Sequence, residues 1–79
     1  MTTHDVLEQI KANIDGAPRN GYVAELHLQV IKFSDELQEV TGKEFCEALG
    51  IGPSFGTEFS KMRKIAGRLK AAGLDPNKI

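Results

Sequence analysis

The chain has 79 residues, enough for one domain with a modest hydrophobic core. Hydrophobic residues make up 41% of it and charged residues of both signs 27%, which excludes a disordered chain and leaves no room for an enzyme with a deep enclosed pocket. One cysteine cannot form an internal disulfide, so a cytoplasmic location is expected. We expect no signal peptide, and no run reaches the roughly 18 apolar residues that a membrane span requires.

The net charge of −1 hides an uneven distribution. Residues 1–42 carry three basic and seven acidic side chains, for a net charge of −4. Residues 43–79 carry seven basic and four acidic side chains, for a net charge of +3. Because a polyanion responds to the local patch rather than to the total charge, the second half of the chain is the candidate for contact with nucleic acid.

The N-terminal segment is predicted to form a helix that begins after Thr2 or Thr3, either of which can cap it. The sequence DGAPRNG, residues 15–21, ends this helix with an Asp-Gly pair, a proline and an Asn-Gly pair, and it can act as a hinge. The apolar residues of the helix recur at helical spacing: Leu7, Ile10 and Ile14.

The second predicted helix carries the most sustained apolar stripe of the chain. Asn20 can cap its start, and the helix is expected to continue through Val40. Acidic side chains off the stripe, at Asp35, Glu36 and Glu39, form a solvated patch or, alternatively, a docking face for a basic partner. The stripe steps by three or four residues: Val23, Leu26, Val30, Phe33, Leu37 and Val40.

A third, short helix is predicted to follow at once, because Thr41 and Glu44 fit a capping box. It ends at Gly50. Its expected buried residues are Phe45, Cys46, Ala48 and Leu49.

A fourth helix is predicted to begin near Pro53 or Ser54, since proline suits the first helical position and serine suits the cap. It ends at Gly73, and Pro76 prevents its continuation. Its inward stripe is Phe55, Phe59, Met62, Ala66 and Leu69, with Ile65 beside it.

The turn Leu49-Gly50-Ile51, with Phe45 and Cys46 before it, resembles the helix-turn-helix of bacterial and phage DNA-binding proteins. In that family an apolar core residue, a small residue and an apolar-Gly-apolar turn occupy these positions. The resemblance covers roughly residues 23–72, including the supporting helix.

The resemblance requires one adjustment after the turn. At the usual turn length Gly56 would fall on a core position, which glycine cannot fill. A turn three residues longer places Phe59 and Met62 there instead, so we interpret GIGPSFG, residues 50–56, as an extended turn. Because proline removes an N–H donor and a helix precedes this loop, we do not interpret its glycines as a nucleotide-binding loop.

The expected fold is all-α, a small helix-turn-helix bundle of about four helices in a single domain, residues 1–79. Residues 1–21 form its N-terminal helix and loop, residues 22–73 the helix-turn-helix core, and residues 74–79 a tail. The resemblance implies a DNA-binding protein, a bacterial or phage transcriptional regulator. The alternative is a non-enzymatic protein–protein interaction module built on a similar bundle.

The fourth helix is the expected contact with double-stranded DNA. Between residues 54 and 72 there are five basic residues and one acidic residue. Short polar side chains near the helix start can reach base edges, long cations farther along can reach phosphates, and free N–H groups at the helix start can hold an anion. The candidate DNA-binding residues are Ser54, Thr57, Ser60, Lys61, Arg63, Lys64 and Arg68.

Other chemistry finds little support in the sequence. His4, His27 and Cys46 lack the paired spacing of a metal site, and His27 is expected to be a half-buried structural residue. No catalytic residue and no cofactor are predicted. A homodimer is expected, with Leu7, Ile10 and Ile14 of the N-terminal helix as its contact, because readers of this type commonly pair on two-fold sites.

Overall fold

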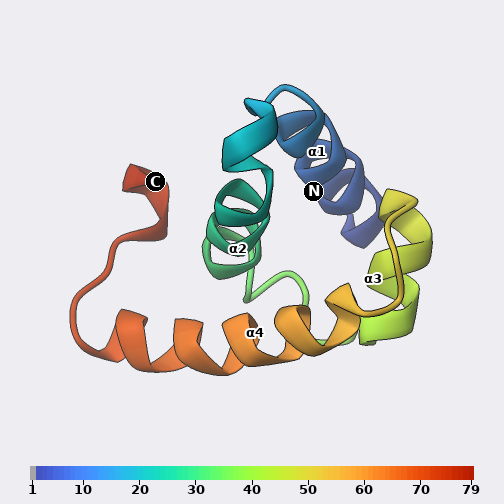
Figure 1. Ribbon diagram of the computed structural model, residues 1–79. Coiled ribbons are helices and arrows are strands. Elements are labelled where there is room, and N and C mark those ends of the chain that lie inside the picture. Colours follow the sequence, from blue (N-terminus) through green and yellow to red (C-terminus); the bar gives the residue numbers. More distant parts are fainter. Residues whose placement is uncertain (1) are drawn as a thin grey trace.

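A computed structural model describes residues 2–79, and this part of the chain contains helices and turns but no strand. The predicted all-α fold is confirmed. Figure 1 shows α4 running along the lower edge of the molecule, with the other three helices above it. The helices are α1 Thr3–Asp15, α2 Tyr22–Lys32, α3 Gly42–Leu49 and α4 Phe55–Ala71, with short 3-10 turns at η1 Arg19–Gly21 and η2 Pro76–Lys78.

Helix α1 begins at a complete capping box. The Thr2 hydroxyl accepts a hydrogen bond from the Asp5 N–H at 3.1 Å, and the Asp5 carboxylate accepts one from the Thr2 N–H at 3.3 Å. The backbone N–H of Thr2 above all, and then the Thr2 side chain, stabilise the carboxylate and hold the pKa of Asp5 below its ordinary value. Helix α1 therefore begins directly after Thr2, one of the two residues that were predicted to cap it.

The apolar face of α1 is covered by its own chain. Val6, Ile10 and Ile14 are buried, and α1 packs against both α2 and α3. Leu7 only borders this core. The prediction that these residues form a dimer contact is therefore wrong, because Ile10 and Ile14 have no surface left to offer a partner.

Helix α2 ends at Lys32, eight residues earlier than predicted. Turns occupy residues 33–39, although Leu37 and Val40 are still buried as the stripe requires. Side-chain donors hold these turns, because the Gln38 amide donates to the Ser34 carbonyl at 2.8 Å and an arginine of α4 binds two further carbonyls. The helical spacing thus predicted correctly that Leu37 and Val40 are buried, but it predicted wrongly that their backbone is helical.

Two further details of α2 differ from expectation. Val23 is 47% exposed, so the buried stripe begins at Leu26. Asn20 does not cap the helix, because it lies inside the turn η1 and Gly21 occupies the cap position without a side-chain hydrogen bond.

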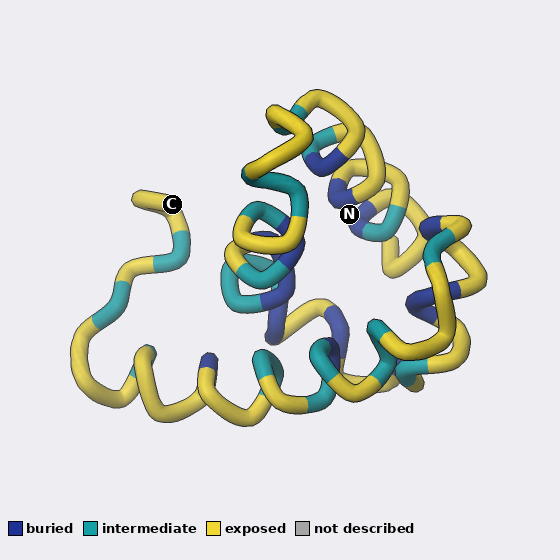
Figure 2. The backbone as a smooth tube through the Cα atoms, in the orientation of Figure 1, coloured by how far each residue is buried: buried dark blue, intermediate teal, exposed yellow. Residues whose placement is uncertain are grey.

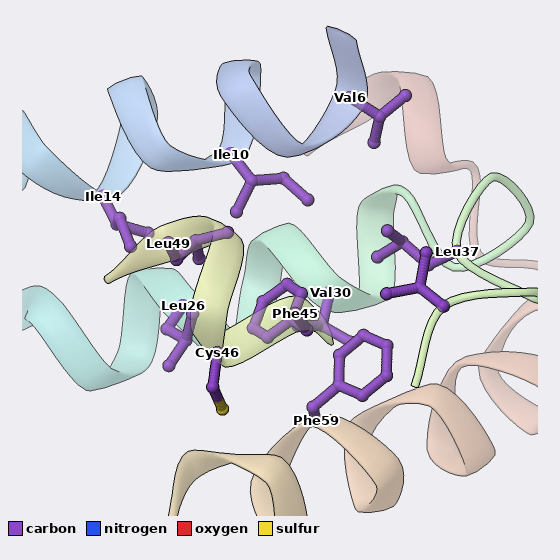
Figure 3. Packing of buried hydrophobic residues seen from close by; sticks show 11 residues of the cluster. Val6, Ile10, Ile14, Leu26, Val30, Leu37, Phe45, Cys46, Leu49 and Phe59 are labelled. Atoms are coloured by element: carbon purple, nitrogen blue, oxygen red, sulfur yellow. The ribbon is translucent and has the colours of Figure 1, made fainter. Parts of the chain in front are cut away.

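The hydrophobic core lies where the four helices meet (Figure 3). Its centre is the stacked pair Phe45 and Phe59, whose ring centroids are 4.4 Å apart.

Cys46 is buried as predicted, and burial raises the pKa of its thiol. Ala48 is exposed, contrary to expectation, because it lies about 100° around α3 from the mean direction of the buried residues Phe45, Cys46 and Leu49. On α4, Phe59 and Ala66 are buried, Phe55 and Met62 border the core, and Leu69 and Ile65 are exposed.

Helices α3 and α4 touch backbone to backbone at two glycines. A Cβ added to Gly42 would lie 3.1 Å from both the Cα and the carbonyl oxygen of Gly56. This contact explains why Gly56 departs from the helix-turn-helix pattern. Instead of filling the core, it lets the start of α3 approach α4 closely.

Candidate nucleic-acid interface

The turn before α4 is extended, as expected, but it covers residues 50–54 rather than 50–56, because Phe55 and Gly56 already belong to α4. Helix α3 ends at Leu49 and is capped by Gly50, whose φ of 68° is in the left-handed region that favours glycine. Residues 50–54 then lead to Phe55, whereas a helix-turn-helix typically uses about three or four residues here. The Ile51 N–H donates to the Cys46 carbonyl and closes the end of α3.

The start of α4 does not offer the predicted anion site. The N–H groups of Phe55, Gly56 and Thr57 donate to the carbonyls of residues 52, 53 and 54. These donors are satisfied within the turn, and the Ser54 hydroxyl makes no capping hydrogen bond. The prediction of free N–H groups at this helix end was wrong, because the turn winds into α4 through 3-10 hydrogen bonds.

One face of α4 points away from the rest of the molecule. Four exposed residues on this face are spaced four, three and four positions apart, and this spacing places them in a single line about 16 Å long. We call this line the outer stripe; Figure 2 shows the outward side of α4 as exposed. It consists of Thr57, Lys61, Lys64 and Arg68, all exposed.

The remaining candidates lie off this line. Ser54 is exposed beside the start of α4, and Ser60 is half-buried on its flank. Lys61 approaches Glu58 at 4.0 Å, a weak contact between exposed groups. Glu58 itself turns toward α2, where its carboxylate lies 3.3 Å from the Nε2 of His27.

His27 is the half-buried residue that the sequence indicated, with 28% of its side chain exposed. Its Nε2 atom is buried and has no partner with hydrogen-bond geometry, so the approach of the Glu58 carboxylate is a close contact rather than a directed hydrogen bond. The pair joins α2 to α4 near the Tyr22–Phe55 contact, an edge-to-face pair with centroids 6.4 Å apart.

Arg63 is bound to its own fold. Its guanidinium donates to the Val40 carbonyl at 2.6 Å and to the Leu37 carbonyl at 2.9 Å, and it lies 4.8 Å above the Phe59 ring. Among the predicted DNA-binding residues, Arg63 is the one whose side chain is engaged within the fold, because these contacts hold the guanidinium against the turns of residues 33–40, which we call the 33–40 turn. The sequence signal was its position on the flank of the helix, next to the inward stripe.

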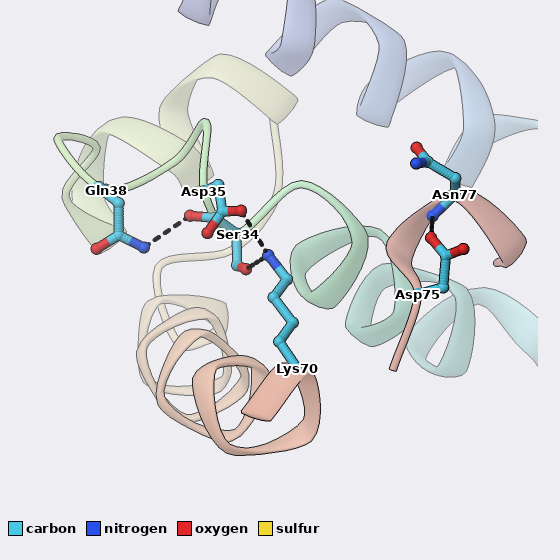
Figure 4. Close-up of polar contacts among 6 residues, drawn as sticks. All are labelled: Ser34, Asp35, Gln38, Lys70, Asp75 and Asn77. Carbon is cyan, nitrogen blue, oxygen red and sulfur yellow. Dashed lines mark hydrogen bonds and ion pairs between the residues drawn. The ribbon is translucent and has the colours of Figure 1, made fainter. Parts of the chain in front are cut away.

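Lys70, in the last turn of α4, is likewise bound to its own fold. Its Nζ lies 2.7 Å from the Ser34 hydroxyl and 3.1 Å from the Asp35 carboxylate, as Figure 4 shows. Ser34 is buried, so this contact satisfies a polar group that is cut off from water. Together, Arg63 and Lys70 fix the side of α4 that faces residues 33–40.

The described residues contain no cluster of three potential metal ligands, and none of their helices is long and apolar enough to cross a membrane. A surface hollow of about 540 Å³ lies between α3 and the turn that follows it. Its walls are mostly apolar, and its residues are Lys43, Cys46, Glu47, Gly50, Ile51 and Pro53.

Comparison with known protein families assigns the chain to a family. Residues 2–72 match the family described as HTH-like domain, so the chain belongs to that family. The match includes α1 and all of α4, which agrees with the helix-turn-helix formed by α3, the extended turn and α4. Neither a curated protein nor a solved structure matches the chain.

Proposed function

We propose that this chain binds double-stranded DNA through α4 and acts as a transcriptional regulator of the bacterial or phage type. The observation that carries this proposal is the outer stripe. Three cations and a threonine share one exposed line on the second helix of a helix-turn-helix, which is the helix that enters the major groove in such proteins.

The position of each side chain on the stripe suggests its role. Thr57, in the first turn of α4, is short and can approach base edges, and Lys61 follows one turn later. Lys64 and Arg68 lie farther along and have the length to reach phosphates. Ser54 and Ser60 flank the stripe at its start and are candidates for further phosphate contacts. Arg63 is not assigned to DNA.

The charge distribution favours one orientation on DNA. The acidic side chains of α1 and of the 33–40 turn belong to elements that do not form the outer stripe, and α1 lies beyond α2 and α3 when viewed from α4 (Figure 1). A polyanion is therefore attracted to one side of the molecule and repelled from the other.

The test is fluorescence anisotropy with a mixed-sequence duplex at about 50 mM and about 200 mM salt. The Lys64→Ala, Arg68→Ala double variant should bind more weakly, and its salt slope should fall by about two, because about 0.9 counterions are released per phosphate contact. The matched control is the Lys11→Ala, Lys78→Ala double variant, which removes the same charge from exposed positions outside α4. Equal loss in both variants would reject α4 as the reader. Absence of wild-type binding at low salt would favour the protein-interaction alternative.

A further inference from the structure

Glu58 is the one acidic side chain among the residues of α4, and it lies beside the outer stripe. It follows Thr57 in the first turn of the helix, about 90° around α4 from the mean direction of that stripe. Because Arg63 and Lys70 are bound within the fold, the charge that α4 presents to DNA comes from the three cations of the outer stripe. A negative charge next to them therefore cancels part of the positive potential where the stripe begins.

The two oxygens of the Glu58 carboxylate face two different side chains. Oε1 lies 4.0 Å from the Nζ of Lys61, the second residue of the outer stripe. Oε2 lies 3.3 Å from the Nε2 of His27 on α2. When His27 is neutral, Lys61 is the only charged group within 4.0 Å of this carboxylate in the described part of the chain. A lysine that balances a neighbouring carboxylate is less available to a phosphate.

The position of His27 suits a charged ring better than a neutral one. Its Nε2 is buried and makes no hydrogen bond, so a neutral ring leaves this atom unsatisfied beside an anion. A protonated ring places a positive charge there, which attracts the carboxylate whatever the angle of the N–H bond. Histidine is the side chain that ordinarily changes charge between about pH 5 and 8, and this chain has two, His4 and His27.

Glu58 is the acidic group that faces His27 most closely. Among the residues that the structure describes, no other carboxylate lies within 4.0 Å of the His27 ring nitrogens. Helix α1 packs on a different side of α2, where Asn13 binds Gln29, two positions or about 200° around the helix from His27. The other charged groups on α2 and on the 3-10 turns packed against it are Glu25, Lys32, Arg19, Asp75 and Lys78.

We propose that DNA binding by α4 is coupled to the uptake of a proton at His27. The inference rests on the proposed function. A protonated His27 balances the Glu58 carboxylate, so Lys61 is free to contact a phosphate and the outer stripe keeps its full charge. Because coupling between two binding events is reciprocal, a bound duplex in turn favours the protonated ring. His27 is thus a positioning residue that touches no DNA and acts through Glu58.

Fluorescence anisotropy with the mixed-sequence duplex, at about 50 mM salt and at about pH 6 and pH 8, tests this coupling. The wild-type chain should bind about three- to tenfold more tightly at the lower pH, because one unit charge near a phosphate in water changes an equilibrium by about that factor. His27→Gln should reduce this ratio to less than about twofold. The matched control is His4→Gln, which removes the histidine that faces Glu8 at 3.1 Å on α1 and should keep the wild-type ratio.

A second variant tests the route through the carboxylate. Glu58→Gln removes the charge that His27 balances, so it should also show a ratio of less than about twofold. It should bind the duplex at the higher pH about as tightly as the wild type does at the lower pH. Circular dichroism at both pH values shows whether each variant is folded.

The outcomes separate the coupling from DNA binding itself. If the wild type binds the duplex and either His27→Gln or Glu58→Gln keeps the wild-type ratio, the coupling is overturned and the proposed function remains. The coupling is equally overturned if His4→Gln loses as much of the ratio as His27→Gln. If His27→Gln does not fold, the comparison of Glu58→Gln with the wild type decides alone. If the wild type binds no duplex at either pH, the proposed function fails and the coupling fails with it.

Discussion

The two flanks of α4 carry similar cations that serve different purposes. On the flank that faces residues 33–40, Arg63 and Lys70 bind carbonyl, hydroxyl and carboxylate oxygens of the same chain. On the outward face, Lys61, Lys64 and Arg68 extend into solvent. A count of basic residues on a helix therefore overstates its charge toward a partner, and the direction of each side chain decides what it can contact.

The inward flank also shows how α4 is held against the rest of the fold. The Phe59 ring packs on Phe45 on one side and carries the Arg63 guanidinium on another. The same guanidinium satisfies two carbonyls in the segment where α2 has already ended. Apolar packing and polar anchoring thus meet at one point and orient α4 together.

The largest effect is expected at the centre of that flank. Phe59→Ala should lower the free energy of unfolding by about 3–5 kcal/mol, since it removes a fully buried ring and leaves a cavity beside Phe45. Urea denaturation followed by circular dichroism measures this change. A loss below about 1 kcal/mol would mean that the inner and outer faces of α4 are assigned the wrong way round.

The next effect compares two neighbouring cations. Arg63→Ala should cost about 1–3 kcal/mol of stability, because the Leu37 and Val40 carbonyls lose their shared donor. Lys64→Ala, the matched control on the outer stripe, should stay within about 0.5 kcal/mol. Thermal and urea unfolding of both variants give the comparison, and equal costs would remove the distinction between the two flanks.

A third prediction concerns the glycine contact that positions the start of α4. Gly42→Ala should destabilise the fold by about 1–3 kcal/mol, because the new Cβ meets the Gly56 backbone, which cannot move aside cheaply. Gly56→Ala is the informative counterpart, since its Cβ would lie at least 3.6 Å from Gly42 and make ordinary contact. Equal destabilisation of the two variants in urea titrations would contradict this asymmetry.

The smallest effect is a gain in stability. Gly67 lies within α4, is exposed, and has nothing within 4 Å of an added Cβ. Gly67→Ala should therefore stabilise the chain by about 0.5–1 kcal/mol through helix propensity alone. Unfolding by urea measures the gain. A loss of stability would show that the space beside Gly67 is occupied.

Sequence patterns predicted the parts of this fold that depend on local physics. The caps at Thr2 and Thr41, the stop at Gly50 and the burial of Phe45 and Phe59 all follow from side-chain type and spacing. The reciprocal half of the second capping box differs, because the Glu44 carboxylate accepts from the Thr41 hydroxyl at 3.0 Å and no capping hydrogen bond to the Thr41 backbone N–H is formed.

The features that sequence patterns did not predict depend on contacts between distant residues. The early end of α2 depends on Arg63, 23 residues beyond the nearer of its two carbonyl partners. The burial of α1 depends on α2 and α3, and a hydrophobic stripe alone cannot show whether such a face packs on its own chain or on a partner chain. The four residues of the outer stripe are exposed, as the helical spacing predicted. The seven candidate DNA-binding residues also included Arg63, an anchor within the fold, since periodicity does not reveal which cation on a flank finds an acceptor.

The most direct test of the central claim is a titration of the isotope-labelled chain with a mixed-sequence duplex, followed by two-dimensional NMR. The proposal predicts that the largest shift changes occur at the amides of Thr57, Lys61, Lys64 and Arg68, while the side-chain signal of Arg63 stays where it is in the free protein. The opposite pattern, with the largest changes on α1 or the 33–40 turn and none along α4, would contradict a DNA interface on the outer stripe.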